Sequence, residues 1–438
     1  MATVDAGDLL GRDIVENSML KTSWKWYATF LSMLGLFVIG IYNYYLQLKF
    51  GLGVTNLDNK VFWGLYITNF VFFIGISHAG TLISAILRVT GAQWRTPITR
   101  LAEEITVLAL IFGAASVFID MGHLDRVMNI VTSGNIDSPL VWDAISISFY
   151  FMGSILFFYL PLIPDLAYYR DNLPKRYWFR RFWYKILAMG YKDDEEQLHI
   201  LEKNITKMSF LIIPIAVSVH TVVSFIMSMT WRVGWNSTLF GPYFVVGAIF
   251  SGLATLMMAL ILFTYGYKLD YYITREHFVS LSKLLLTFTI FYVYFTLAEY
   301  LTGGYKSEVH ETELLHALFY GQYAAMFWYF IFGGMIFPII ILVFVIYDKK
   351  LSDRMVKVLI FIASAMINVG MWLKRYLITV PTLARPVFHE GWNDYFPNKV
   401  EWWILVGQFA GFIMLFMLLS KMFPIISVWE VEMEEEMH

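Results

Sequence analysis

Histidines inside long apolar segments are the first sign of chemistry in this sequence. His78 lies towards the middle of the uncharged run 61–87, and His220 lies within VSVHTVVSF, residues 217–225. A titratable ring in a segment long enough to cross a bilayer is costly to bury, so it is read first as a functional residue. For each histidine taken alone, a hydrogen-bonded packing role is the competing interpretation.

Further ionisable side chains lie near the same ends of other apolar runs. Each one has a second interpretation, because a charged side chain near a membrane interface can extend to water. Arg375 has a structural alternative as the partner of a carboxylate such as Asp143 or Glu299. Taken together, the group predicts a polar pocket in the outer half of the membrane that handles protons or a polar headgroup; its members besides the two histidines are Asp120, His123, Asp143, Glu299, Lys374 and Arg375.

A second polar group lies on the opposite side of His78. Glu103 and Glu104 begin the next apolar run, while Thr81 and Ser84 continue inward from His78. These residues predict a hydrated route from the inner surface to His78. The alternative is that the two glutamates stabilise a helix N-terminus, where the macrodipole favours negative charge.

The elements that must position these residues are membrane-spanning helices. The chain of 438 residues is 58% hydrophobic and only 15% charged, which is too little charge to cover a soluble protein of this size. The sequence therefore predicts an all-α polytopic membrane protein of about ten transmembrane helices. We place them near 26–47, 61–87, 101–121, 140–164, 208–229, 242–267, 284–303, 322–347, 356–380 and 401–424.

The loops between the spans predict the orientation. With the N-terminus inside, the inner loops carry nineteen Lys and Arg residues and the outer loops carry seven. By the positive-inside rule, both termini face the cytoplasm. The domains expected are a cytoplasmic segment 1–25, a transmembrane domain 26–424 and an acidic, solvated cytoplasmic tail 425–438.

The longest inner loop, about 169–207, interleaves aromatic and basic residues in YRDNLPKRYWFRRFWYKIL. This pattern is typical of a helix lying on an anionic lipid surface. Binding to nucleic acid is the other interpretation of such a pattern, and ten membrane spans disfavour it.

The residue inventory disfavours several other chemistries. The chain contains no cysteine, so it has no disulfide and no thiolate-ligated iron–sulfur cluster. A cytochrome with two haems needs two pairs of facing histidines, and only His78 and His220 lie deep in spans. No Walker, dinucleotide-binding or HExxH pattern is present.

Several blocks of sequence stand out from the second span to the last: GISHAGTLISAILR (75–88), WRTPITRLAEEIT (94–106), LVWDAISISFYF (140–151), LIPDLAYYRD (162–171), VSVHTVVSF (217–225), LFGPYFVVGAIFSG (239–252), NVGMWLKRY (368–376) and the ending that starts at WWILVGQFAGF. These blocks resemble NrfD/PsrC-type membrane subunits, with the greatest likeness to the ActC and ActF subunits of alternative complex III.

The resemblance implies two four-helix bundles with two flanking helices, and no haem or iron–sulfur cluster in this chain. It implies a quinone or menaquinone bound near the outer surface of a prokaryotic cytoplasmic membrane. An iron–sulfur subunit on the extracytoplasmic face would pass electrons to cytochrome c or molybdopterin-type subunits, beside other membrane subunits. By matching motif, His78, Asp143, His220 and Arg375 line the quinone site or its proton path, and Glu103 lies on the inner route.

From these residues we predict catalytic roles for His78, Asp143, His220 and Arg375. Glu299 joins them in quinone binding, and a proton path uses Glu103, Glu104, Asp120 and His123. The chain departs from the family pattern at Ile226 and Lys374, where acidic residues are expected. A membrane anchor of a polysulfide-, tetrathionate- or arsenate-type molybdoenzyme, a proton-coupled secondary transporter and a di-haem cytochrome remain open alternatives.

Overall fold

The protein is a bundle of helices in a computed structural model, which describes residues 6–192, 194–385 and 391–436. In these parts of the chain all regular structure is helical. Ten helices are long and apolar enough to cross a membrane, which confirms the predicted fold class. They are α2 (Trp24–Phe50), α3 (Leu65–Val89), α4 (Thr96–Met121), α6 with α7 (Pro139–Asn172), α9 (Glu195–Ser228), α10 (Phe240–Tyr267), α11 (Arg275–Lys306), α13 with α14 (Ala324–Tyr347), α15 (Asp353–Ala384) and α16 (Lys399–Met422).

Polar residues at the helix ends fix where several spans begin. The Ser352 side chain accepts a hydrogen bond from the Met355 amide at the start of α15. Asn398 and Glu401 form a capping box at the start of α16, in which each side chain accepts from the other residue's backbone. These caps satisfy backbone groups that would otherwise lack partners at the membrane surface.

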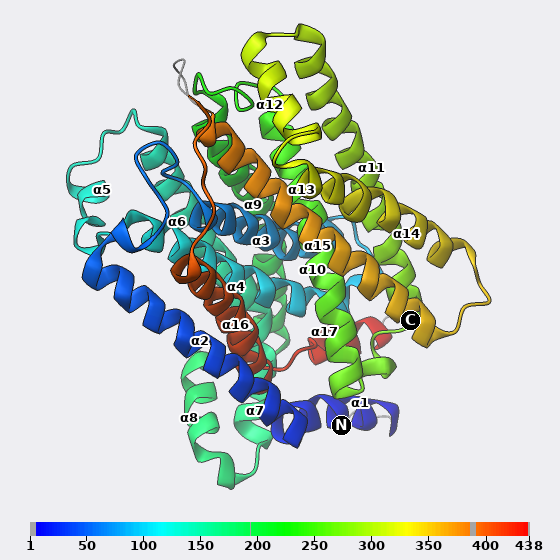
Figure 1. Ribbon diagram of the computed structural model, residues 1–438. Helices are drawn as coiled ribbons and strands as arrows, with labels where there is room; N and C mark the ends of the chain where they lie inside the picture. Colours follow the sequence, from blue (N-terminus) through cyan, green and yellow to red (C-terminus); the bar gives the residue numbers. More distant parts are fainter. Residues whose placement is uncertain (1–5, 193, 386–390, 437–438) are drawn as a thin grey trace.

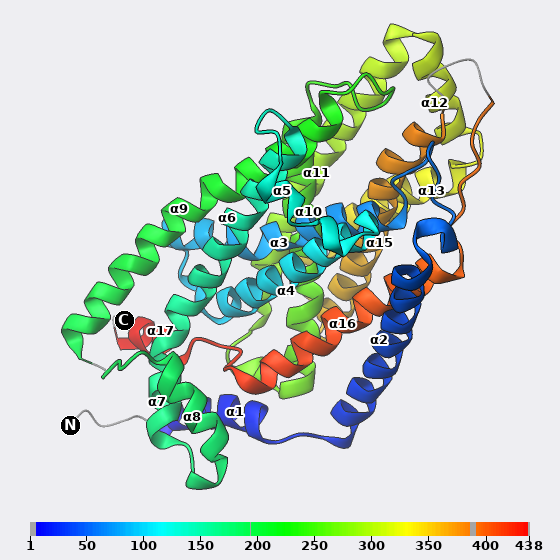
Figure 2. The same cartoon turned by 90° about the vertical axis from the view of Figure 1, so that its left-hand side faces the viewer.

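Helix α3, which carries His78, is the centre of the bundle. Its most apolar stretch is 94% buried by the rest of the protein, and it contacts α4, α9, α10 and α15. Figures 1 and 2 both show it enclosed by other helices. Helices α4, α6 and α9 pack on one side of it, while α11, α14 and α15 pack around α10 on the other. A side chain in the central part of α3, such as His78, is therefore shielded from both water and lipid.

The first and last spans, α2 and α16, pack against each other at the edge of the bundle (Figure 1). Gly40 and Gly407 face each other at the crossing, and a Cβ added to Gly40 would lie 2.6 Å from the Cα of Gly407. Small residues allow this close backbone approach, which supplies van der Waals packing where lipid removes the hydrophobic driving force.

Both described ends of the chain fold onto one end of the bundle. Helices α1 (Ala6–Leu20), α7 (Ile163–Asn172), α8 (Trp178–Leu187) and α17 (Val428–Glu436) gather there, as both views show. The expectation of a solvated acidic tail is wrong for Glu430, which is only 3% exposed. Its carboxylate lies 2.6 Å from an Arg88 nitrogen and 3.0 Å from an Arg95 nitrogen.

A buried ion pair holds the same end together. Arg100 on α4 lies 2.5 Å from the Asp165 carboxylate on α7 and donates to the Pro161 carbonyl and to Ser427 Oγ. The first turns of α4 and α7 and the segment before α17 are therefore joined through one guanidinium group.

Replacing Gly40 with alanine should destabilise the protein. The new methyl group would overlap the α16 backbone, and overpacking of this kind costs about 1–3 kcal/mol. Gly35→Ala, on the same helix with open space around its Cβ position, is the matched control and should be neutral or slightly stabilising. The midpoint of thermal unfolding in detergent measures both changes. Equal midpoints for the two variants would contradict the close approach of the α2 and α16 backbones at Gly40.

Docking of α17 should weaken in acid. Burial raises the pKa of Glu430, but the guanidinium groups of Arg88 and Arg95 outweigh it and hold the pKa below its ordinary value. A lowered pKa stabilises docking above the ordinary glutamate range near pH ~4.3, and this stabilisation is lost as the pH falls through the lower, docked-state pKa. Protection of α17 from hydrogen exchange, taken relative to the intrinsic exchange rate at each pH, should be strong at pH 7 and weaker below about pH 4.

The variant Glu430→Gln should show fast exchange in α17 already at neutral pH, with little further change in acid. Glu196→Gln, at an exposed carboxylate of α9, is the control. Slow exchange in Glu430→Gln at pH 7 would show that the ion pairs do not hold α17 in place.

Candidate functional site

The two histidines singled out from the sequence meet in the centre of the bundle. His78 on α3 and His220 on α9 have ring centroids 4.0 Å apart, at a steep angle, and neither ring is exposed. His78 Nδ1 lies 2.7 Å from the Ile74 carbonyl, and its Nε2 lies 2.6 Å from the Ala216 carbonyl. A neutral imidazole carries one N–H, so it donates to only one of these carbonyls at a time. Both ring nitrogens of His220 lack a hydrogen-bond partner among the described residues.

Arg375 on α15 completes this group, which we call the histidine cluster (His78, His220 and Arg375). Its guanidinium carbon lies 4.8 Å from the centre of the Phe244 ring, and the same ring lies 6.3 Å from that of His220. Its Nη2 is buried without a hydrogen-bond partner in the part of the chain that the structure describes. Gly247 on α10 leaves room for it, because a Cβ there would lie 3.1 Å from Nη2. A buried cation with a free donor is equipped to bind an anionic or carbonyl oxygen.

The preceding residue, Lys374, points to a second group. Its ammonium lies 2.8 Å from the Tyr300 hydroxyl and 3.8 Å from the nearer Glu299 oxygen, and its side chain is 1% exposed. Three aromatic rings surround the ammonium, with centroids at 4.7–5.5 Å; they belong to Tyr243, Tyr300 and Phe330. Lys374, Glu299 and Tyr300 form what we call the lysine cluster.

A π-helical segment supports the lysine cluster. Residues Tyr329–Ile336 between α13 and α14 form a π-helix, and this segment carries Phe330. Gly334 within it packs closely on Gly370 of α15, the helix that carries Lys374. Such segments occur often at functional sites, where they redirect a side chain.

Two stacked tyrosines join the clusters. The rings of Tyr243 and Tyr292 have centroids 4.8 Å apart; Tyr243 lies under Lys374, and Tyr292 is close enough to interact electrostatically with Arg375. Tyr243 shares a hydrogen bond of 2.9 Å with Thr296, while the Tyr292 hydroxyl is buried with no partner in the described segments. The two tyrosine rings therefore lie between the cation of the lysine cluster, Lys374, and the cation of the histidine cluster, Arg375.

A small cavity of about 60 Å³ opens beside the lysine cluster. The ends of α11 and α15, helix α12 (Val309–Phe319) and the loop before α10 form its walls, at the opposite end of the bundle from α8 (Figure 2). The Glu299 oxygen Oε2 is buried there with no partner in residues 6–192, 194–385 and 391–436. Its polar and charged lining residues are Asn236, Ser237, Glu299, Tyr300, Thr302, Lys306, Glu311, Lys374 and Thr382.

Polar side chains continue from His78 towards the end that carries the termini. The Tyr150 ring lies 4.9 Å from that of His78, and its hydroxyl lies 3.2 Å from Thr81 Oγ1. One turn further along α3, Ser84 donates to Glu103 at 2.6 Å. All of these residues are buried, and their hydroxyl groups lie between His78 and the Glu103 carboxylate, where the sequence predicts an inner route.

The remaining predicted residues are spread over the molecule. Asp143 on α6 is 8% exposed, and its Oδ1 has no hydrogen-bond partner among the described residues. Its backbone carbonyl accepts a hydrogen bond from Ser146, and within the described chain it makes no hydrogen bond or ion pair with the histidine cluster. Glu104 is buried, with Oε1 unpartnered by any described residue. Asp120 is about 25 Å from Glu103 along α4, by helical rise, and His123 follows the end of that helix. Asp120 lies near Glu401, and His123 is exposed beside Asp125 at 3.4 Å.

The tyrosines of the site were not predicted. Tyr150, Tyr243, Tyr292 and Tyr300 are four of the 27 tyrosines in an aromatic-rich chain, so residue type alone gave no signal. Lys374 belongs to the predicted polar pocket, but the sequence predicts no catalytic or binding role for it. Its position beside Arg375, on a helix whose neighbours point about 100° apart, was the available signal for two clusters.

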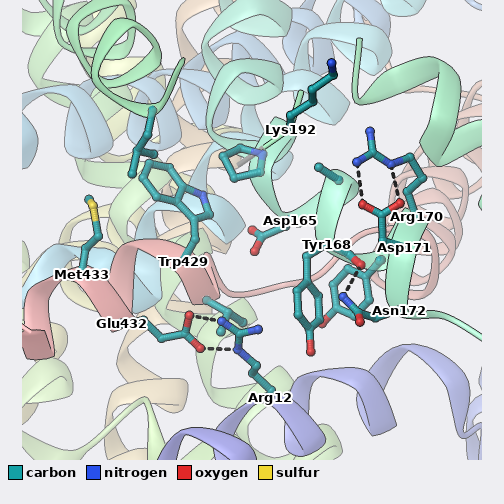
Figure 3. A pocket seen from close by; sticks show the side chains of 15 residues that line it. Arg12, Asp165, Tyr168, Arg170, Asp171, Asn172, Lys192, Trp429, Glu432 and Met433 are labelled. Carbon is teal, nitrogen blue, oxygen red and sulfur yellow. Dashed lines mark hydrogen bonds and ion pairs between the residues drawn. The ribbon is translucent and has the colours of Figure 1, made fainter. Parts of the chain in front are cut away.

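A larger cavity of about 380 Å³ lies at the opposite end, between α1, α7 and α17 (Figure 3). Four of its charged groups pair with one another, Arg12 with Glu432 and Arg170 with Asp171 at 2.6 Å, and Asp165 is paired with Arg100. It is therefore a polar junction between terminal helices, far from the two clusters.

The histidine pair does not fit a haem. Axial ligation by two histidines requires the porphyrin to lie between them, and here the rings touch at 4.0 Å. Within the described residues, no group of three or more His, Cys, Asp or Glu side chains is placed to hold a metal ion. Hydrogen bonding and proton transfer are the chemistry that these side chains themselves supply.

Comparison with known proteins gives consistent matches. Residues 53–386 match the family described as "Polysulphide reductase, NrfD". A selenate reductase subunit from Mesobacillus selenatarsenatis is 26% identical over 93% of this chain and 95% of its own length. The Hdr-like menaquinol oxidoreductase integral membrane subunit of Archaeoglobus fulgidus is 25% identical over 94% and 96%. The menaquinone reductase integral membrane subunit of Nitratidesulfovibrio vulgaris is 26% identical over 83% of each chain.

Lys374→Met should destabilise the protein strongly, because it leaves Glu299 in a buried site without its cation. Removing one member of a buried ion pair costs about 3–5 kcal/mol. The double variant Lys374→Met with Glu299→Gln should regain most of this loss, since no uncompensated charge remains. Thermal unfolding in detergent measures both; a double variant no more stable than Lys374→Met would contradict the pairing.

Proposed function

The chain belongs to the NrfD family, and we propose that it is the membrane subunit through which a respiratory oxidoreductase complex oxidises a menaquinol-type quinol. Two of its relatives, each aligned over most of its length, bear names that specify menaquinol or menaquinone. Oxidation of a quinol releases two electrons and two protons, so the site must accept protons and pass on electrons.

The observation that carries this proposal is the buried pair of touching histidine rings beside a free guanidinium donor. His220, with both nitrogens unpartnered in the described chain, is placed to take a proton from a quinol hydroxyl. Arg375 is placed to stabilise the negative charge that develops on the quinol oxygen. Both roles use only side chains that the histidine cluster itself contains.

Protons and quinol would use different sides of the histidine cluster. The cavity beside Lys374 and Glu299 supports entry of the polar headgroup from the end that the charge distribution predicts to be outside. The stacked tyrosines lead from that cavity to Arg375. The file of Tyr150, Thr81, Ser84 and Glu103 supports proton exchange towards the opposite surface, which is where any proton translocation would occur.

Electrons must leave through a partner. The chain has no cysteine to ligate an iron–sulfur cluster, and its histidine pair does not hold a haem. We infer an iron–sulfur subunit docked on the outer face, above the ends of α11, α12 and α15, as in alternative complex III. Further electron carriers would be cytochrome c or molybdopterin-type subunits.

A second candidate is the membrane anchor of a molybdenum reductase. The selenate reductase relative from Mesobacillus selenatarsenatis, which aligns over nearly the whole chain, favours it. The chemistry assigned to this chain is the same in both cases, since each complex draws electrons from quinol. The partner that co-purifies with the chain distinguishes the two, and a lone chain that is active in transport would contradict both.

The test is quinol oxidation by the purified complex with substituted histidine or aspartate. His220→Ala should lower the turnover number by about 10²-fold or more, because it removes the proton acceptor while leaving the complex assembled. Asp143→Ala should also abolish turnover, through loss of a proton-accepting or orienting carboxylate. His199→Ala, an exposed histidine on the same helix α9, is the matched control and should retain the wild-type rate. Wild-type rates in both His220→Ala and Asp143→Ala would end this proposal.

A further inference from the structure

Helix α8 presents an aromatic face that nothing else in the described chain covers. Residues spaced i, i+1, i+4, i+5 and i+8 form one stripe along it, as expected for a single helical face. All five side chains are exposed, from 44% for Trp183 to 71% for Trp178; the stripe consists of Trp178, Phe179, Phe182, Trp183 and Ile186. A stripe of this kind is buried by lipid or by protein in a working molecule.

The opposite face of α8 is fixed to the bundle. Tyr184 is 3% exposed, and its hydroxyl donates to the Met422 carbonyl at the end of α16 at 2.5 Å. Arg181 donates to the Arg170 carbonyl on α7 at 3.1 Å. The helix is therefore held with its aromatic stripe pointing away from the protein. Figure 2 shows α8 projecting at the end of the bundle.

Two cations lie at the edge of this helix without a carboxylate beside them in the described chain. Arg180 Nη1 is buried and has no hydrogen-bond partner among the described residues. Lys421, at the end of α16, is close enough to Arg180 for electrostatic repulsion, and it donates only to the carbonyls of Ser18 and Lys21 in the described chain. Its ammonium also lies 4.5 Å from the Tyr267 ring. Two uncompensated positive charges beside an apolar stripe are complementary to an anion that carries hydrocarbon.

We propose that α8 and the pair Arg180–Lys421 bind a phospholipid with an anionic headgroup. The phosphate would accept from Arg180 and neutralise the repulsion with Lys421, while the acyl chains would cover the aromatic stripe. Aromatic residues with flanking cations are the composition found at membrane interfaces. The inner loops, including that of α8, hold most of the loop lysines and arginines, which favours an anionic leaflet over a mixed-charge protein surface at this end.

The full chain, purified in mild detergent with any bound partners, tests the proposal. Phospholipid retained per chain is counted by phosphorus assay and identified by mass spectrometry. The wild type should retain an anionic phospholipid in preference to phosphatidylcholine, and Arg180→Ala should retain it about fivefold more weakly. Lys192→Ala, an exposed lysine in the same loop but off the helix, should match the wild type. Equal retention by Arg180→Ala and wild type would overturn the proposal.

A second variant separates the headgroup from the hydrocarbon. Trp178→Ser with Phe182→Ser changes only exposed side chains, so the fold should survive, and retention of the anionic lipid should fall. If this variant keeps the lipid and instead loses a protein subunit, the stripe is a protein interface and the proposal is wrong. Displacement of the lipid by millimolar inorganic phosphate would likewise overturn it, since the site would then recognise a free anion.

Discussion

The cost of burying charge at membrane depth is the constraint on which the rest of this structure depends. Several ionisable side chains inside the bundle meet it by pairing. Arg100 binds Asp165, Lys374 lies beside Glu299, and the His78 ring sits between two backbone carbonyls. Against this background, the nitrogens of His220 and Arg375 that find no partner in the described chain are exceptions that the fold itself does not explain. Their proximity to each other makes a ligand the simplest account of both.

Two neighbouring residues of α15, Lys374 and Arg375, belong to different clusters. Lys374 and Arg375 are adjacent on α15, so their side chains leave the helix about 100° apart. Lys374 reaches Glu299 and Tyr300 on α11, and Arg375 reaches Phe244 of α10 and the histidines beyond. Helix α15 therefore ties a surface-accessible polar cavity to a fully enclosed histidine pair. A movement of α15 would alter both at once.

Hydropathy predicted the ten spans because each must offer an apolar surface to lipid, and the helices begin and end within about a turn or two of most predictions. The largest exception is α9, which starts at Glu195, thirteen residues before the predicted 208, and α11 starts at Arg275, nine residues before the predicted 284. In both cases the helix continues beyond the hydrocarbon, where hydropathy no longer indicates it. Depth alone placed His78 about mid-membrane and His220 in the outer half of its span, and the contact between them depends on the packing of α3 on α9. The same limit applies to Asp143, whose neighbours depth could not identify. Glu430 shows the converse: its acidic surroundings indicated solvation, and only tertiary contacts with Arg88 and Arg95 bury it.

The contact between the two imidazoles constrains how the proposed site can work. Two positive charges on rings 4.0 Å apart, with Arg375 already nearby, would repel one another strongly in a medium of low dielectric. The pair can therefore hold one added proton at a time. A quinol gives up two, so under the proposed function the first would leave before the second arrives. The hydroxyl groups between Tyr150 and Glu103 would serve as the exit, because the Tyr150 ring lies 4.9 Å from that of His78. Proton release along these groups and electron release to an outer partner would then be tied to the same histidines.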